Sequence, residues 1–162
     1  MIKIENKGRV RLGLISDTHG LFRPEVRALF KGVDYILHAG DIGKPAVLQE
    51  LQKIAPVTAV TGNLDIAAWF PQCEKNEIIE AAGKRIFILH DLNDLDIDPV
   101  TAEIGAVIHG HTHKPSVRQR KSVWYINPGS AGPHRFMLPV SVAVMEVGEQ
   151  MTVRHYTIKD KR

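Results

Sequence analysis

The sequence predicts an α/β fold in which two packed sheets carry helices on their outer faces. Two observations lead to this expectation. The first half of the chain alternates short apolar runs with segments of helical spacing, and the second half consists mainly of apolar runs in hairpin-like pairs. No repeat, low-complexity segment or flexible linker divides the 162 residues, of which 44% are hydrophobic. A single domain over residues 1–162 with its own buried core is therefore expected.

Three buried strands and two helices are predicted in the first half. Short apolar runs at 10–16, 35–38 and 57–60 have the length of buried strands. The segments 24–30 and 45–54 have helical spacing, and each has a proline near its start, Pro24 and Pro45. Proline is favoured at such positions because its fixed backbone angle suits the first helical turn.

Strands are predicted to dominate from residue 77 onward. The runs 77–82 and 85–90 flank Gly83 and Lys84, which indicates a hairpin. A short buried strand is expected at 106–109. Further hairpin strands are expected within 116–126 and within 140–156, the latter turning near Gly148 and Glu149.

Composition argues against several classes of partner. No run of about eighteen apolar residues is present, so no membrane span is predicted. The net charge is +3, but the basic residues are dispersed and aromatic residues make up only 6%, which argues against a nucleic-acid platform. The single cysteine, Cys73, suits a reducing compartment, so a cytoplasmic protein is expected. The apolar segment 66–71 is either part of the core or a contact in a homo-oligomer.

Potential metal ligands follow five of the predicted strands at the points where these strands end. They are Asp17, His19, Asp41, Asn63, His90, His111 and His113. In open α/β sheets such positions meet in the crevice beyond the carboxyl ends of the strands. The members of the pairs 17/19 and 111/113 are two residues apart, so extended backbone would direct each pair to one side. Glycines at 40, 62 and 110 are expected to permit tight backbone where the ligands converge.

The ligand types indicate divalent metal chemistry. Carboxylate, amide and imidazole groups in one site suit Mn, Fe, Zn, Co or Ni. Seven ligands are too many for one tetrahedral ion and suit two ions that share a carboxylate. Two such ions can activate water and stabilise charge on oxygen, as phosphate ester cleavage requires. Taken singly, the ligands Asp17, His19, Asp41 and Asn63 are also explained as loop or capping residues, and His90 as a core histidine. The stretch HGHTH is costly to explain as packing, and the joint occurrence of all seven at successive strand ends favours the metal site.

At these positions the sequence resembles the calcineurin-like metallophosphoesterase family. The matching motifs, in the family's order, are Asp17-Thr18-His19, Gly40-Asp41, Gly62-Asn63, His90 and Gly110-His111-Thr112-His113. The short length, the stretch GNLD and the stretch NPGS at 127–130 resemble its small phosphodiesterase branch. The resemblance implies a four-layer α/β/β/α sandwich of two mixed sheets flanked by helices.

The resemblance also implies a ligand set and a reaction. It assigns Asp17, His19 and His113 to a first metal, Asn63, His90 and His111 to a second, and Asp41 to a bridge between them. Manganese is the expected ion, with Ni, Co, Fe or Zn as alternatives. A hydroxide held between the metals would attack phosphorus in line in a small phosphodiester substrate. Asp41 and Asn63 would then act as catalytic residues.

Two departures from the family pattern bear on the mechanism. Larger members carry histidine directly after the GN asparagine, where it assists the leaving group, whereas this chain has Leu64. Either another group such as His134 donates the proton, or the enzyme needs good leaving groups; His134 and Arg135 are also candidate contacts for a substrate phosphate. His90 is followed by Asp91 where the family usually has glycine. This carboxylate is expected to reorient the loop or to act behind a ligand.

Alternative functions stay open at this point. The retromer small subunit shares the family's fold and works as a protein-interaction scaffold with a degraded metal site, so the fold alone does not separate enzyme from scaffold. The complete set of seven ligands favours the enzyme. Among enzymes, a phosphomonoesterase or a nuclease is the alternative to a phosphodiesterase. Leu64 weighs against the first and the dispersed basic charge against the second.

Overall fold

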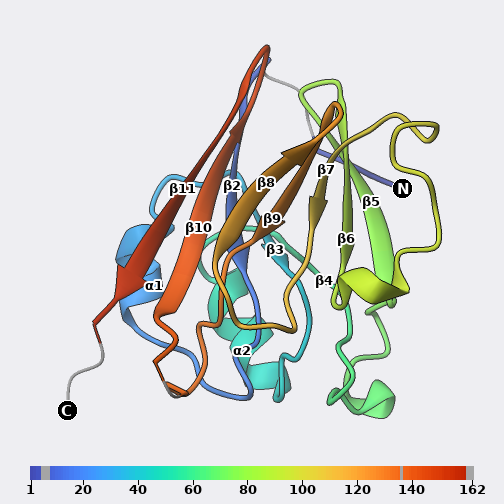
Figure 1. The fold of residues 1–162 in the computed structure, drawn as a ribbon. Helices are drawn as coiled ribbons and strands as arrows, with labels where there is room; N and C mark the ends of the chain where they lie inside the picture. The colour runs from blue at the N-terminus through green and yellow to red at the C-terminus, as the bar shows by residue number, and fades with distance from the viewer. Residues whose placement is uncertain (5–7, 136, 160–162) are drawn as a thin grey trace.

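The computed structural model describes residues 1–4, 8–135 and 137–159, and its two sheets pack face to face (Figure 1). One sheet has five strands in the order β11-β10-β2-β3-β4. Their bounds are β2 (Val10–Ile15), β3 (Tyr35–His38), β4 (Val57–Ala59), β10 (Val140–Val147) and β11 (Met151–Ile158). Strands β2, β3 and β4 are parallel, and β10 is antiparallel to both β2 and β11.

The other sheet has six strands in the order β1-β5-β6-β7-β9-β8. Their bounds are β1 (Ile2–Lys3), β5 (Asn76–Ala81), β6 (Lys84–Leu89), β7 (Ile104–Ile108), β8 (Ser116–Arg120) and β9 (Val123–Asn127). Strands β6, β7 and β9 are parallel, whereas β5–β6 and β8–β9 form antiparallel hairpins. Both sheets are therefore mixed, which confirms the expected fold class.

The main core lies between the two sheets and follows the period-two alternation of the strands. Leu12 and Leu14 of β2 are fully buried in one cluster with Ile86 and Ile88 of β6. Gly13, between the two leucines, points to the opposite face. A Cβ there would lie 2.9 Å from ring carbons of Phe30, so the missing side chain makes room for this ring.

The outer faces of the two sheets are covered differently. Helices α1 (Glu25–Leu29) and α2 (Pro45–Gln52) cover the five-stranded sheet, where Phe30 and Leu51 are fully buried. The six-stranded sheet is covered by the short 3₁₀ helix η2 (Leu92–Asp94) and the loop after it, whose Leu95 and Ile97 pack on Val107. Four layers are thus present, with α-helices on one side only among the described residues. The β6–β7 connection carries Asn93, several aspartates and Pro99, which disfavour an α-helix.

The expected elements are confirmed within a few residues, and the differences have local causes. The β5–β6 turn is formed by Ala82 and Gly83, both with positive φ (48° and 75°), so Lys84 already belongs to β6. Such a two-residue turn needs positive φ at both central positions. In the segment 66–71, η1 (Ala67–Trp69) is followed by the buried Phe70, whereas Trp69 is 50% exposed. None of the helices in the described part of the chain has the length and apolar character to cross a membrane.

Candidate metal centre

The loops that follow the parallel strands of both sheets meet at one end of the sandwich, the lower end in Figure 1. Within the five-stranded sheet, the N–H of Asp17 donates to the carbonyl of Gly40 at 3.0 Å. Between the sheets, Nδ1 of His90 after β6 hydrogen-bonds the carbonyl of Ala39 after β3 at 2.8 Å. The seven predicted ligands all follow these strands, so they lie at the carboxyl-end edge of the sheets where we expected them.

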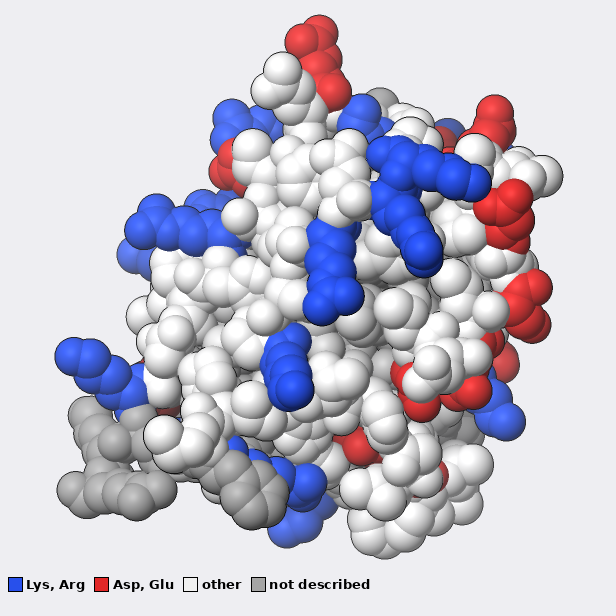
Figure 2. Space-filling model, in the orientation of Figure 1, with Lys and Arg blue, Asp and Glu red and all other residues white. Residues whose placement is uncertain are grey.

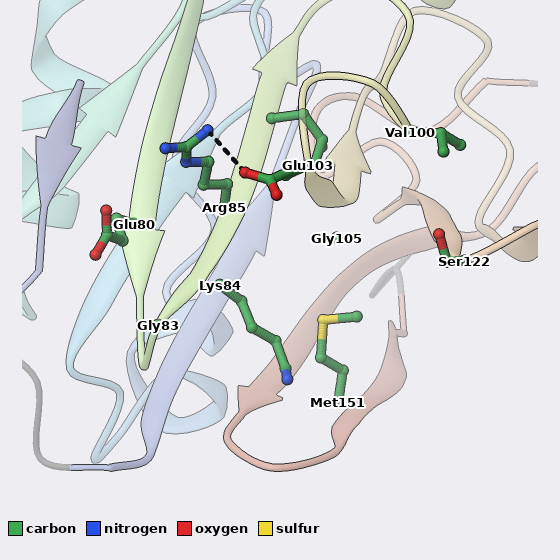
Figure 3. Close-up of a pocket in the computed structure, with 10 residues that line it drawn as sticks. Glu80, Gly83, Lys84, Arg85, Val100, Glu103, Gly105, Ser122 and Met151 are labelled. Carbon is green, nitrogen blue, oxygen red and sulfur yellow. Dashed lines mark ion pairs between the residues drawn. The ribbon is translucent and has the colours of Figure 1, made fainter.

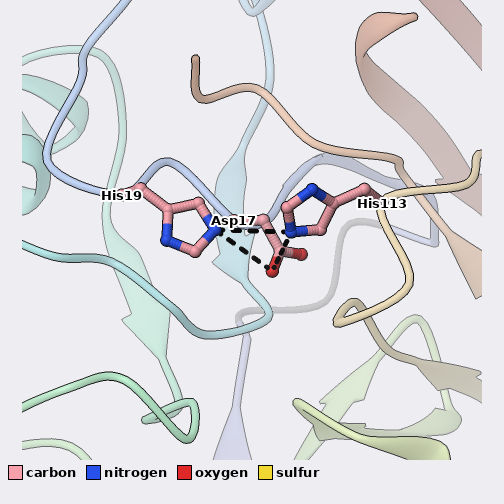
Figure 4. A group of neighbouring side chains, drawn as sticks. All are labelled: Asp17, His19 and His113. Carbon is pink, nitrogen blue, oxygen red and sulfur yellow. Dashed lines mark hydrogen bonds and ion pairs between the residues drawn. The ribbon is translucent and has the colours of Figure 1, made fainter. Parts of the chain in front are cut away.

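A first group of possible ligands consists of Asp17, His19 and His113 (Figure 4). Nε2 of His113 lies 3.2 Å from Oδ1 of Asp17, and Nε2 of His19 lies 3.8 Å from the same oxygen. The two Nε2 atoms are 3.3 Å apart. One oxygen and two ring nitrogens therefore point at a common position, as the ligands of a single ion do.

A second group consists of Asp17, Asp41 and His90. Nε2 of His90 lies 3.4 Å from Oδ2 of Asp41 and 3.9 Å from Oδ1 of Asp17. Oδ2 of Asp41 is also 3.9 Å from Nε2 of His19. Asp17 is the member that both groups share, and Asp41 lies between the histidines of the two groups.

Two atoms at this centre are buried without a hydrogen-bond partner. Oδ1 of Asp17 and Nε2 of His90 have none in the described part of the chain, and both residues are at most 4% exposed. An unpaired buried polar atom costs about 1–3 kcal/mol, and more when it is charged. A cation bound between these atoms would remove that cost. The residues present therefore fit a divalent metal.

The electrostatics of the centre favour a bound cation. Burial opposes ionisation of Asp17, but the His113 ring beside it and the hydrogen bond from Ser16 outweigh burial and lower the pKa of Asp17. For Asp41 burial is likewise outweighed, chiefly by His90, and its pKa is lowered. Burial of His90 is outweighed by Asp41 and Asp17, which raise its pKa to about 9. Both carboxylates are thus held ionised in a buried position.

The remaining two predicted ligands lie at the rim of the centre. The His111 ring meets the His90 ring edge-on, with centroids 5.3 Å apart, and its side chain is 41% exposed. Nε2 of His111 faces Oδ2 of Asp91 at 3.6 Å. Asn63 is exposed and lines a hollow together with His90 and His111. Asp91, which follows the predicted ligand His90, thus lies against a second predicted ligand.

The expectation that extended backbone aligns the ligand pairs is wrong. Positive φ angles occur at five of the seven predicted ligands: Asp17 (55°), His19 (47°), Asp41 (52°), His111 (71°) and His113 (64°). The chain turns sharply after each strand, and this turn, rather than strand alternation, sets the directions of these side chains. Left-handed conformations cost about 1–3 kcal/mol at such residues and cluster at functional sites.

Asp65 is a positioning residue that sequence reasoning did not identify. Its carboxylate accepts hydrogen bonds from the backbone N–H groups of Ile42 (3.2 Å), Gly43 (2.9 Å) and Gly62 (2.8 Å). The loop that carries Asp41 is thereby held against the loop that carries Asn63. The only sequence signal was its place within GNLD, two residues after a predicted ligand.

The stretch 127–130 supports two of the ligand loops. Nδ2 of Asn127 donates to the carbonyl of Gly110 at 3.1 Å and contacts Oγ1 of Thr112 at 3.0 Å. Oγ of Ser130 donates to the carbonyl of Asp17 at 3.0 Å. His155 of β11 contacts the Asn127 carbonyl at 2.7 Å and so belongs to the same support.

The three glycines next to the ligands allow close approach, as expected. A Cβ at Gly40, Gly62 or Gly110 would lie within 3 Å of a predicted ligand. His134 is half-buried and shares a small hollow with His113 and Arg135. This places His134 near the first group but does not test a role in substrate binding.

A second hollow lies at the opposite end of the sandwich, at the start of β6 and β7 (Figure 3). Its charged side chains are engaged with one another or with backbone. Nη1 of Arg85 is 3.9 Å from Oε2 of Glu103, and Nζ of Lys84 donates to the carbonyl of Glu149. In the described part of the chain, both groups of possible metal ligands lie at the other end.

The two-sheet sandwich and the carboxylates and histidines gathered at its strand ends define a domain of the metallophosphoesterase type. The family model described as "Calcineurin-like phosphoesterase superfamily domain" matches residues 10–150. The chain therefore belongs to this family, whose members bind divalent metals.

Two curated relatives and one solved structure illustrate the range of similarity. The "Probable metallophosphoesterase" of Methanothermobacter thermautotrophicus is 36% identical, with 86% of this chain and 88% of the relative covered. Phosphodiesterase YfcE of Escherichia coli is 24% identical, with 85% and 88% covered. The zinc complex of Vps29 from Entamoeba histolytica superimposes with a TM-score of 0.77 at 24% identity, over 94% of each chain. The last likeness shows a shared fold.

Proposed function

We propose that this chain hydrolyses phosphodiester bonds with two divalent metal ions bound at the strand-end centre. The observation that carries the proposal is the pair of overlapping ligand groups that share Asp17, together with the unpartnered atoms of Asp17 and His90 among the described residues. Family membership and the phosphodiesterase named among its relatives support the same activity.

In this proposal the first metal is held by Asp17, His19 and His113, and the second by Asn63, His90 and His111. Asp41 reaches both, since its Oδ2 lies 3.9 Å from Nε2 of His19 and 3.4 Å from Nε2 of His90. Manganese is the proposed ion, although the ligand types also suit Ni, Co, Fe or Zn. Bound divalent ions would lower the pKa of water and neutralise charge that develops on phosphoryl oxygens.

The residues around the ions have separate tasks. Hydrogen bonds to Ser16 and to the His111 N–H fix Oδ2 of Asp17 at 2.6 and 3.1 Å, leaving Oδ1 for a metal. The N–H of Leu64 holds Oδ1 of Asp41 at 3.0 Å, leaving Oδ2 between the two groups. Asn63 at the rim would donate to a phosphoryl oxygen, and His134 would contact the substrate.

The side chain of Leu64 cannot transfer a proton, and it is 62% exposed beside the centre. General acid catalysis typically contributes 10²–10⁴-fold. We therefore infer that turnover depends on the leaving group, with activated diesters cleaved well and unactivated monoesters slowly.

The test is hydrolysis of bis(p-nitrophenyl) phosphate and of p-nitrophenyl phosphate. The protein is stripped of metal, and Mn, Ni, Co, Zn or Mg is restored singly. Metal-dependent cleavage of the diester, lost in Asp41→Ala and His111→Ala, is the expected result. Glu149→Gln, an exposed position at the far turn, serves as the control that keeps full activity.

The scaffold remains the second candidate because the Vps29 structures share this fold. It predicts metal binding without turnover of either ester. A protein that binds two ions by calorimetry and cleaves neither substrate under any metal would contradict the proposed activity and favour the scaffold.

A further inference from the structure

A hollow of about 650 Å³ opens directly beside the second ligand group. Its inner wall is formed by Asn63, His90 and His111, so any phosphodiester bound at the centre places one of its ester substituents next to this space. His90 is 4% exposed, and its Nε2 has no hydrogen-bond partner in the described part of the chain. His90 also belongs to the second ligand group, so the hollow adjoins the metal centre itself.

The outer wall of this hollow is acidic. Asp91, Asp94 and Asp96 line it from the β6–β7 connection, and Lys75 is the basic residue on its lining. Three carboxylates against one ammonium group give a net charge of about −2. Among the described residues, no hydrogen bond or ion pair engages the side chain of Asp94 or of Asp96. Their charge is thus available to a ligand.

The opposite side of the centre has the reverse charge. Arg135 lines a small hollow together with His113 of the first ligand group. Arg135 is exposed in the loop that also carries His134. Figure 2 shows the wider pattern on one face, where Lys and Arg side chains are spread over the hairpin β8–β9 and Asp and Glu gather along the flank to its right. Next to the centre, Arg135 lies on the side of His113, and the three aspartates lie on the side of His90.

We propose that the hollow beside His90 and His111 selects phosphodiesters whose ester substituent carries a positive charge, such as a primary or quaternary ammonium group. This inference rests on the proposed function and narrows its substrate class. The phosphate would lie at the metals, and the ammonium group would lie against Asp94 and Asp96. Polyanionic diesters such as nucleic acids would be repelled by the same wall.

The test compares p-nitrophenyl phosphorylcholine with its neutral isostere, 3,3-dimethylbutyl p-nitrophenyl phosphate, in which carbon replaces the nitrogen. Both release p-nitrophenol from a diester of the same shape. At low ionic strength we expect kcat/KM to be about five- to tenfold higher for the cationic ester, since two carboxylates act over a few ångströms of solvated space. The preference should shrink as salt is added.

The variant Asp94→Asn/Asp96→Asn should bring the ratio of the two esters to about one and leave cleavage of bis(p-nitrophenyl) phosphate unchanged. Asp98→Asn removes the same charge from the same loop outside the hollow and should keep the wild-type ratio. A wild-type ratio near one, with bis(p-nitrophenyl) phosphate still cleaved, overturns the selectivity and leaves the phosphodiesterase intact.

Two further outcomes are distinguishable by calorimetry on the metal-loaded protein. If no diester is cleaved, the proposed function fails. In that case the selectivity is tested by binding alone. Phosphorylcholine should bind at least fivefold more tightly than 3,3-dimethylbutyl phosphate, and equal binding of the two overturns the proposed selectivity. A stoichiometry of three Mn ions that falls to two in the double variant, with no ester preference, would show that the wall binds a metal and would also overturn the proposal.

Discussion

Replacing Gly110 by alanine tests whether close packing of the two sheets positions the centre. A Cβ at Gly110 would lie 2.6 Å from Oδ2 of Asp17 and closer still to Oγ of Ser16. Ordinary non-bonded contacts lie near 3.5 Å, so the loop after β7 and the end of β2 must separate by about 1 Å. Gly110 is not among the residues with positive φ, so the substitution acts through this contact rather than through backbone strain.

The expected cost has two parts. Overpacking of a tight site costs about 1–3 kcal/mol. The hydrogen bonds to Oδ2 of Asp17 from Ser16 and from the His111 N–H are also stretched, and one bond to a charged group contributes about 1.5–3 kcal/mol. Together they give a loss of about 2.5–6 kcal/mol in the free energy of unfolding, which is about 5–24 °C in Tm for a chain of this size.

The assay is thermal unfolding with and without Mn. A metal ion that binds the folded state and not the unfolded chain raises Tm. Asp17 belongs to both ligand groups, so Gly110→Ala should also reduce the rise in Tm that Mn produces. Gly105→Ala, within the preceding strand β7, is the matched control. Its Cβ would meet only ordinary contacts, 3.6 Å or more away, and the change should be within about 0.5 kcal/mol. Equal Tm values and equal Mn responses in the two variants would refute the reasoning.

Three further predictions follow from single contacts. Leu64→His should raise kcat/KM for diesters with poor leaving groups by about 10²-fold while hardly changing bis(p-nitrophenyl) phosphate hydrolysis; equal gains on both substrates would contradict a proton-transfer role. Asp91→Gly removes the carboxylate that lies 3.6 Å from Nε2 of His111 and orients this ring. The lower-affinity Mn site should then weaken about 10-fold in a calorimetric titration, and an unchanged isotherm would contradict an orienting role of Asp91. Burial, together with the charges of Asp65 and Glu74, raises the pKa of Cys73 to about 11. Alkylation of this thiol at pH 8 should therefore be about 100-fold slower than in the unfolded protein, and an equal rate would contradict the burial.

Local pattern predicted the elements of this fold well because each apolar run carries its own signal of period and length. The runs 35–38 and 45–54 correspond to β3 and α2 with little change. The pattern of strand and helix signals led us to expect helices on the outer faces of both sheets. In the described part of the chain, the six-stranded sheet is instead covered by η2 and the loop of the β6–β7 connection. The aspartates and Pro99 of this connection determined the outcome locally.

The order of strands in each sheet was not accessible from the sequence. β10, late in the chain, pairs with β2, and β9 lies between β7 and β8. Such pairings depend on burial summed over whole sheets, which no single segment encodes.

By itself, the sequence determined which residues could bind metal, because side-chain chemistry and position after a strand are local properties. Only the tertiary structure decided how they combine. It made Asp17 the member common to both groups, turned His111 toward Asp91, and placed Asp65 between two loops. The physical reason is distance along the chain: His19 and His113 are 94 residues apart, yet their ring nitrogens are 3.3 Å apart. Their meeting requires both sheets to pack first and the backbone to adopt left-handed turns that local preference disfavours.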